Sequence, residues 1–163
     1  MTKLLQSQSE VILDASQETV FDVVTGPILL PRTSSSDWAR MEFGPPTAAR
    51  ATFVETIELA GEPMRFACRV DTCRRPFLWM ASTRSILPAQ FGGVHMTLTA
   101  IHTVDPWESG RTRFRRSMIA AVRFETAVPQ QVIDLFGNDA VHEGFIAQVQ
   151  SRIGLSGNPA RSR

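Results

Sequence analysis

The feature that most constrains the fold is an alternation of apolar and polar residues that begins near residue 38 and continues to residue 121. Successive side chains of a β-strand point to opposite faces, so a period of two predicts strands. Turn residues, chiefly glycine and proline, separate the alternating segments and predict an antiparallel succession. The predicted strands cover residues 38–43, 51–59, 64–73, 76–84, 94–104 and 112–121.

The N-terminal part of the chain has a different pattern. Residues 4–13 read as a first strand, and Asp14 or Ser16 can cap the helix that follows, because either side-chain oxygen can accept a hydrogen bond from an early backbone N–H. This helix would end at Gly26. A further helical turn around residues 28–30 fits the sequence as well. We therefore expect one or two short helices between the first and second strands.

After Pro129 the apolar residues follow the 3.6-residue period of a helix as far as residue 153. Gly137-Asn138 can break or kink this helix. A chain of 163 residues, 43% of them hydrophobic, suits one domain with a substantial core. We predict a single α+β domain over residues 1–155 and a disordered tail over residues 156–163.

Composition excludes several classes of function. The net charge of +1 gives no strong field for nucleic acid or anionic lipid. We find neither a signal peptide nor an apolar run that could span a membrane, and we expect a cytoplasmic protein. Cys68 and Cys73 would lie roughly 16 Å apart on one strand, too far for an internal disulfide.

Two segments resemble a known superfamily. The segment EVILDASQETVFDVV resembles the first strand and helix start of START/Bet v 1-like (SRPBCC) proteins, and SGRTRFRRSM resembles their penultimate turn and last strand. The resemblance covers about residues 4–153. The superfamily includes bacterial polyketide cyclases and aromatases. It implies a helix-grip fold, in which a curved seven-stranded antiparallel sheet wraps around a long C-terminal helix and leaves a cavity. Residues 31–37, PRTSSSD, depart from the family pattern. The superfamily shares no catalytic signature that could be transferred.

Strand parity identifies polar residues that share the apolar side of the predicted elements. In residues 94–104, His102 alternates in phase with the apolar residues, whereas His95 lies on the polar side. The complete set is Glu55, His102, Arg116, Asp139 and His142, the last two lying three residues apart on the C-terminal helix. These residues are candidates for general acid/base work and anion binding. Each also has a structural interpretation, as a satisfied core histidine, an ion pair between Glu55 and Arg116, or a solvated helix face.

Aromatic and methionine side chains could line the cavity and suit a flat hydrophobic ligand. They are Trp38, Phe53, Phe66, Trp79, Met96, Phe114 and Met118. The alternative is that they are simply core. The facing of strand 76–84 is undecided, because both of its sides are apolar near Phe77 to Met80. The loop over residues 86–93, which contains Phe91, could gate the entrance.

Together these observations favour a cofactor-free cyclase, aromatase or dehydratase that acts on a hydrophobic, polyketide-like substrate. His102 and His142 would carry protons, Arg116 would anchor an anion or carbonyl, and Glu55 or Asp139 would orient them. The alternatives are a non-catalytic carrier or sensor with the same cavity, and an adaptor that binds another protein. An outward arginine patch could dock an acyl carrier protein, and a homodimer partner is a further option. No metal site is expected, because the ligands lack a compact spacing.

Overall fold

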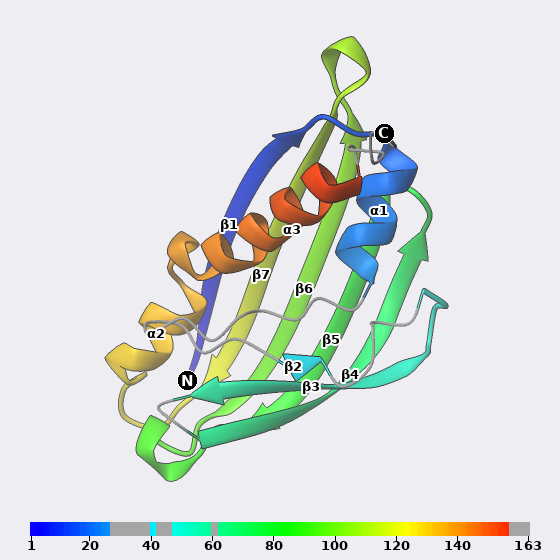
Figure 1. Cartoon of the computed structure of the whole chain (residues 1–163). Coiled ribbons are helices and arrows are strands. Elements are labelled where there is room, and N and C mark those ends of the chain that lie inside the picture. The colour runs from blue at the N-terminus through cyan, green and yellow to red at the C-terminus, as the bar shows by residue number, and fades with distance from the viewer. Residues whose placement is uncertain (27–39, 42–46, 60–61, 157–163) are drawn as a thin grey trace.

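A computed structural model describes residues 1–26, 40–41, 47–59 and 62–156 of the chain (Figure 1). Six long antiparallel strands form an open sheet: β1 (Thr2–Leu13), β3 (Thr52–Leu59), β4 (Glu62–Arg74), β5 (Leu78–Ile86), β6 (His95–Pro106) and β7 (Thr112–Arg123). The two-residue strand β2 (Arg40–Met41) pairs with β3 at one edge. The sheet order is β1-β7-β6-β5-β4-β3-β2. The α+β class and the antiparallel succession are therefore confirmed.

Only β1 pairs out of sequence order. Strands β3 to β7 form a meander in which each strand pairs with the next one along the chain, whereas β1 lies beside β7. Their register runs from Thr2 opposite Arg123 to Leu13 opposite Thr112. This pairing places the first and last strands side by side (Figure 1).

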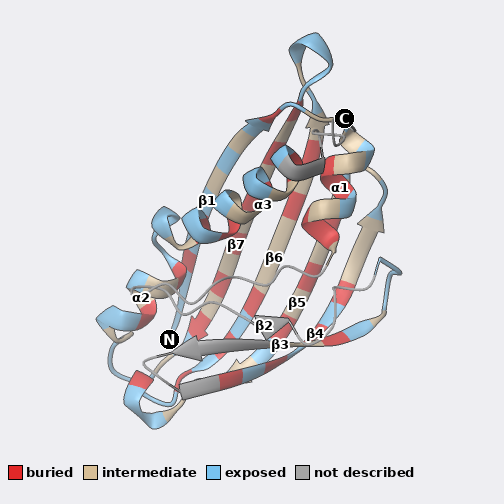
Figure 2. Ribbon diagram, viewed as in Figure 1, coloured by how far each residue is buried: buried red, intermediate tan, exposed pale blue. Residues whose placement is uncertain are grey.

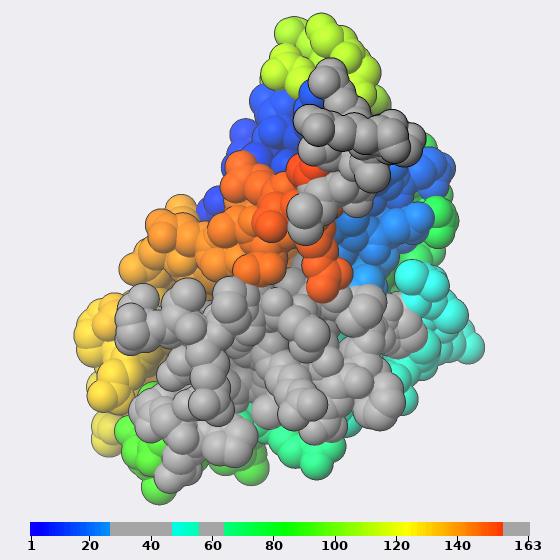
Figure 3. Space-filling view, viewed as in Figure 1, coloured from blue at the N-terminus to red at the C-terminus, as the bar shows by residue number. Residues whose placement is uncertain are grey.

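The helices α1 (Gln17–Thr25) and α3 (Glu143–Ser156) lie over the same face of the sheet, which we call the inner face (Figure 1). Buried and less buried positions alternate along the long strands, as in β7 (Figure 2). In the space-filling view α1 and α3 lie side by side (Figure 3). The apolar core therefore lies between the inner face and the two helices.

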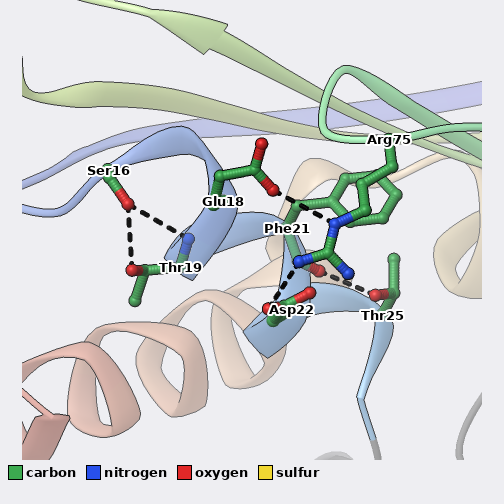
Figure 4. A network of polar contacts seen from close by, with 7 residues as sticks. All are labelled: Ser16, Glu18, Thr19, Phe21, Asp22, Thr25 and Arg75. Carbon is green, nitrogen blue, oxygen red and sulfur yellow. Dashed lines mark hydrogen bonds and ion pairs between the residues drawn. The ribbon is translucent and has the colours of Figure 1, made fainter.

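Helix α1 begins as its sequence predicts. Ser16 is the N-cap, and its Oγ accepts a hydrogen bond from the Thr19 N–H at 3.3 Å (Figure 4). Arg75, from the turn after β4, donates to Glu18 at 3.1 Å and to Asp22 at 2.9 Å. These ion pairs tie the exposed side of α1 to the sheet.

The predicted C-terminal helix is interrupted. Helix α2 (Gln130–Phe136) ends at Gly137, the 3₁₀-helix η3 (Asp139–His142) follows, and α3 begins at Glu143. The break occurs at Gly137-Asn138, where the sequence allowed one. The Asn138 side chain accepts from the Ala140 N–H at 3.0 Å and so starts a new helical segment.

The structure decides the facing of the strand that sequence left open. Trp79, Ala81 and Thr83 of β5 are buried on the inner face, whereas Phe77 lies in the preceding turn and is 53% exposed. In the predicted gate loop, Phe91 belongs to the 3₁₀-helix η1 (Ala89–Phe91) and is buried. A second 3₁₀-helix, η2 (Glu108–Gly110), connects β6 to β7.

Several predictions lie outside the described residues: the helical turn at 28–30, Trp38 and residues 157–163 of the predicted tail. The first residue of that tail, Ser156, is the last residue of α3 instead. Cys68 and Cys73 both lie on β4 as free thiols. In the described part of the chain, no helix is both long enough and apolar enough to cross a membrane.

Candidate functional site

Two neighbouring strands place a histidine and an arginine side by side in the core. The register sets His102 of β6 directly opposite Arg116 of β7. Both side chains point to the inner face, and His102 is only 4% exposed and Arg116 only 8%. The alternation of each strand thus brings the two predicted residues together, as parity indicated.

His142 of η3 completes this group. Nη1 of Arg116 lies 2.7 Å from Nδ1 of His142, and Nε2 of His142 lies 3.1 Å from Oγ of Ser7 on β1. A guanidinium can only donate, so Nδ1 must accept and the ring proton must lie on Nε2, which donates to Ser7. His142 is therefore neutral, with both nitrogens engaged.

The electrostatics agree with this tautomer. Burial, followed by the charge of Arg116, lowers the pKa of His142 from 6.5 to about 4, although the Ser7 backbone and Asp139 oppose the change. Burial also lowers the pKa of Arg116 to about 10, with Glu55 acting in the opposite direction. Arg116 consequently keeps its charge at neutral pH.

The charge of Arg116 is compensated in two ways. Its guanidinium lies 4.6 Å from the centre of the Phe145 ring of α3, a favourable cation–π arrangement. Glu55 of β3 attracts it through space, although within the described residues no hydrogen bond or ion pair joins the two. The Glu55 side chain is half-buried, and burial raises its pKa while Arg116 lowers it.

An aromatic box surrounds His102. The centre of its ring lies 5.0 Å from Trp79, 5.4 Å from Phe114 and 5.2 Å from Phe145. Burial, followed by the charge of Arg116, holds the pKa of His102 well below 6.5, with a smaller contribution from His142. The Val24 carbonyl opposes this shift as a hydrogen-bond acceptor. His102 is therefore neutral at physiological pH.

Within the described residues, two buried polar atoms of this group have no hydrogen-bond partner: Nδ1 of His102 and Nε of Arg116. A buried polar atom without a partner costs about 1–3 kcal/mol, so such atoms are rare in native proteins. In the tautomer that carries its proton on Nε2, Nδ1 of His102 presents a lone pair. The site thus offers one acceptor and one charged donor on adjacent strands.

Asp139 does not orient His142 as predicted. Its side chain is exposed, and Oδ1 accepts a hydrogen bond from the backbone N–H of Gln8 at 2.7 Å, which ties η3 to β1. The helix break at Gly137 turns Asp139 outward, because the 3₁₀ geometry of η3 replaces the spacing of a continuous helix. Asp139 therefore influences His142 only through its charge.

Sequence analysis missed Ser7 and Phe145. Ser7 shares the inward parity of β1 with Leu5, and Phe145 lies three residues after His142, so both signals were present in the pattern. A hydroxyl among apolar neighbours on a buried strand face is the signal that could have identified Ser7.

The described members of the predicted apolar lining are buried, but they lie at different positions along the strands. Buried members are Phe53, Phe66, Trp79, Met96, Phe114 and Met118. Trp79 and Phe114 contact His102 directly, and Phe53 reaches it through Trp79, with 6.0 Å between ring centres. Met96 lies six residues from His102 along β6, about 20 Å away. Met96 therefore belongs to the core at the other end of the sheet.

The outward arginines of β7 pair with acidic side chains, which largely neutralises the predicted arginine patch. Arg116 points inward, while Arg113 pairs with Asp105 at 3.2 Å and Arg115 pairs with Glu10 at 3.1 Å. Within the described residues no cluster of three or more histidine, cysteine or acidic side chains could hold a metal ion.

Comparisons with known proteins identify the fold. No protein-family model and no curated protein matches the chain. Among solved structures, norcoclaurine synthase from Thalictrum flavum is similar with a TM-score of 0.62 and 13% identity over 96% of this chain and 98% of that one. Ara h 8.0201 has a TM-score of 0.61 with 12% identity, over 95% of this chain and 100% of that one. A START superfamily protein from Mycobacterium smegmatis has a TM-score of 0.58 with 14% identity, over 93% and 98%. The chain has the START/Bet v 1-like fold.

Proposed function

We propose that this protein binds a hydrophobic, aromatic small molecule on the inner face of the sheet and catalyses a cofactor-free, proton-transfer reaction on it. The observation that carries this proposal is the pair of unpartnered polar atoms, Nδ1 of His102 and Nε of Arg116, in an aromatic interior. A ligand with a carbonyl or anionic oxygen and an acidic C–H bond would satisfy both atoms.

The proposed chemistry assigns a separate role to each group. Nδ1 of His102 takes the proton from a carbon next to the ligand carbonyl. The electron pair of that C–H bond forms a C=C bond, and the π pair of the C=O bond moves onto the oxygen. The N–H on Nε of Arg116 donates to this oxygen and stabilises the enolate. The negative charge formed beside His102 offsets the cost of placing a positive charge on its buried ring.

In this proposal His142 positions Arg116 and transfers no proton to or from the ligand, since both of its nitrogens are already hydrogen-bonded. Glu55 balances the charge of Arg116, and Asp139 acts only at a distance. Enolisation of this kind is a step in cyclisation and dehydration of polyketide-like substrates, which fits the resemblance to cyclases and aromatases. The structure of norcoclaurine synthase with dopamine and hydroxybenzaldehyde supports an aromatic ligand for a fold of this kind.

A non-catalytic carrier is the second candidate. The low pKa of His102 favours it, because a histidine that resists protonation is a weak base. The carrier would use the same interior and the same arginine, and only turnover separates the two functions. An acyl carrier protein is a less well supported partner, because the arginines of this chain that would dock it are already paired with acids.

The test begins with a native mass spectrum of freshly purified protein, in which a retained small molecule would give the mass of the ligand. Binding is then measured with anilinonaphthalene sulfonate, an aromatic anion whose fluorescence increases in apolar surroundings. We expect Arg116→Met to weaken binding at least tenfold. Ser117→Ala is the matched control, because Ser117 is the next residue of β7 and points to the opposite face. Equal affinity in Arg116→Met and wild type would refute the inner site.

Catalysis is tested by deuterium incorporation into phenylacetone, a benzylic ketone with acidic C–H bonds, followed by NMR in D₂O. We expect His102→Gln to abolish deuterium exchange while its ligand affinity stays within about tenfold of wild type. We expect His142→Gln to retain part of the exchange activity. Wild-type protein that binds the dye but exchanges no deuterium would favour the carrier. Normal exchange in His102→Gln would overturn the assignment of the base.

A further inference from the structure

A second group of cationic side chains lies on the outer face of the sheet, far from His102. It occupies the end of the sheet where β5 and β7 finish and β6 and β1 begin, near the label N in Figure 1. A hollow of about 610 Å³ is lined there by Arg84, His95 and Arg123, together with Thr2, Thr97 and Ile86. A neighbouring hollow of about 680 Å³ shares Thr2, His95 and Arg123 with it.

The strand register explains why these side chains converge. His95 is paired directly with Arg123 across β6 and β7, and Thr2 of β1 is paired with Arg123 on its other side. Arg84 is paired with Thr97, which is two residues from His95 and shares its face. The two arginines are thus two strands apart, about 10 Å across the sheet, with His95 and Thr97 between them.

Neither arginine of this group is paired with an acid in the described part of the chain. Among the described residues, no hydrogen bond or ion pair engages the side chains of Arg84, His95 or Arg123. On the same face, nearer the beginning of β7, two arginines are paired with acids: Arg113 with Asp105 and Arg115 with Glu10. Glu125 lines the neighbouring hollow but forms no ion pair with Arg123.

The two guanidinium groups repel each other, and a neighbouring acid would relieve this repulsion. Here the described chain supplies none within pairing distance. Two guanidinium forks and an imidazole N–H offer several donors to one anion, and arginine forks match the geometry of phosphate oxygens. The hydroxyl groups of Thr2 and Thr97 can add further donors.

We infer that this outer hollow binds a phosphate group attached to a small organic moiety. Arg84 and Arg123 hold the phosphate from two sides, and His95 donates to it from below. Ile86, which is 60% exposed, and Ala121 provide the apolar contact for the organic part. The phosphate belongs either to a free phosphate monoester or to the headgroup of an anionic lipid. This site is independent of the inner site and of its proposed reaction.

The experiment uses the full chain and phenyl phosphate, with isothermal titration calorimetry at 150 mM salt. We expect saturable binding with one site per chain. Arg84→Gln or Arg123→Gln should weaken it at least tenfold, and His95→Gln should weaken it several-fold. Arg74→Gln is the control, because it removes the same charge from an exposed position on β4. Dye binding at the inner site should be unchanged in all four variants, which also shows that they fold.

A second arm separates the two sources of phosphate. Sedimentation with vesicles of phosphatidic acid in phosphatidylcholine is compared with pure phosphatidylcholine. Binding to the acidic vesicles that Arg84→Gln and Arg123→Gln remove would assign a lipid headgroup, whereas binding of phenyl phosphate alone would assign a free monoester. No saturable binding in either arm would overturn the inference. So would an equal loss in Arg74→Gln, since the effect would then reflect net charge only.

Discussion

Acid should destabilise this protein through His142, because the folded state holds that ring neutral. Its pKa falls from 6.5 to about 4 on folding, mainly through burial and then through Arg116. Each unit of pKa corresponds to about 1.4 kcal/mol. The free energy of unfolding is therefore about 3 kcal/mol lower once the pH is below both pKa values. The contribution is fully present above pH 6.5, begins to fall there, and is lost as the pH approaches 4.

The size of the effect at an accessible pH follows from the same two values. Between pH 7.5 and pH 5, the free energy of unfolding should decrease by about 2 kcal/mol through His142 alone. His142→Gln is the informative variant, since a glutamine can accept from Arg116 and donate to Ser7 without titrating. The assay is urea denaturation at both pH values for wild type and variant. Glu55, His102 and other groups titrate in both proteins, so their effects cancel in the difference.

An equal loss of stability in wild type and His142→Gln would refute the reasoning, because it would mean that His142 is not held neutral in the core. Nitrogen-15 NMR of the imidazole rings checks the tautomer independently. We expect His142 to carry its proton on Nε2 at pH 7. A doubly protonated ring at that pH would contradict the hydrogen bond from Arg116.

Three further results are expected. Phe114→Ala should lower the free energy of unfolding by about 3–5 kcal/mol, measured by urea denaturation, because it empties a fully buried site beside His102. Ser16→Ala should cost about 1 kcal/mol in the same assay, since the N-cap hydrogen bond of α1 is lost; an unchanged midpoint would contradict that role. In native protein at pH 8, iodoacetamide should alkylate Cys73 and spare Cys68, whose burial raises its pKa to about 12; intact mass spectrometry reads the number of adducts, and peptide mapping the site.

Much of the inner face could be predicted because strand parity is local. Each side chain on β6 or β7 takes its face from its neighbours in sequence, so His102 and Arg116 were placed correctly by counting in twos. The same counting could not decide β5, where both faces near Trp79 are apolar. There the choice depends on which face α1 and α3 cover, and this is tertiary information.

Contacts between elements far apart in the chain could not be predicted from the sequence. The bonds of His142 to Arg116 and to Ser7 join η3, β7 and β1, and no periodicity relates these segments. Asp139 was misplaced for a related reason, since the break at Gly137 changes the direction of the next few side chains. The cationic hollow required the register between β5, β6 and β7, which parity does not supply.

The pairing of β1 with β7 has a consequence for how the chain is made. Strand β1 is synthesised before the strands that follow it, and its partner from Thr112 to Arg123 is synthesised about a hundred residues later. At roughly 5–20 residues per second, β1 waits between about 5 and 25 seconds with its backbone unpaired. The β3 to β7 hairpins can meanwhile form from local contacts as they emerge. Translation speed over this interval therefore sets how long β1 stays without its partner strand in each new molecule.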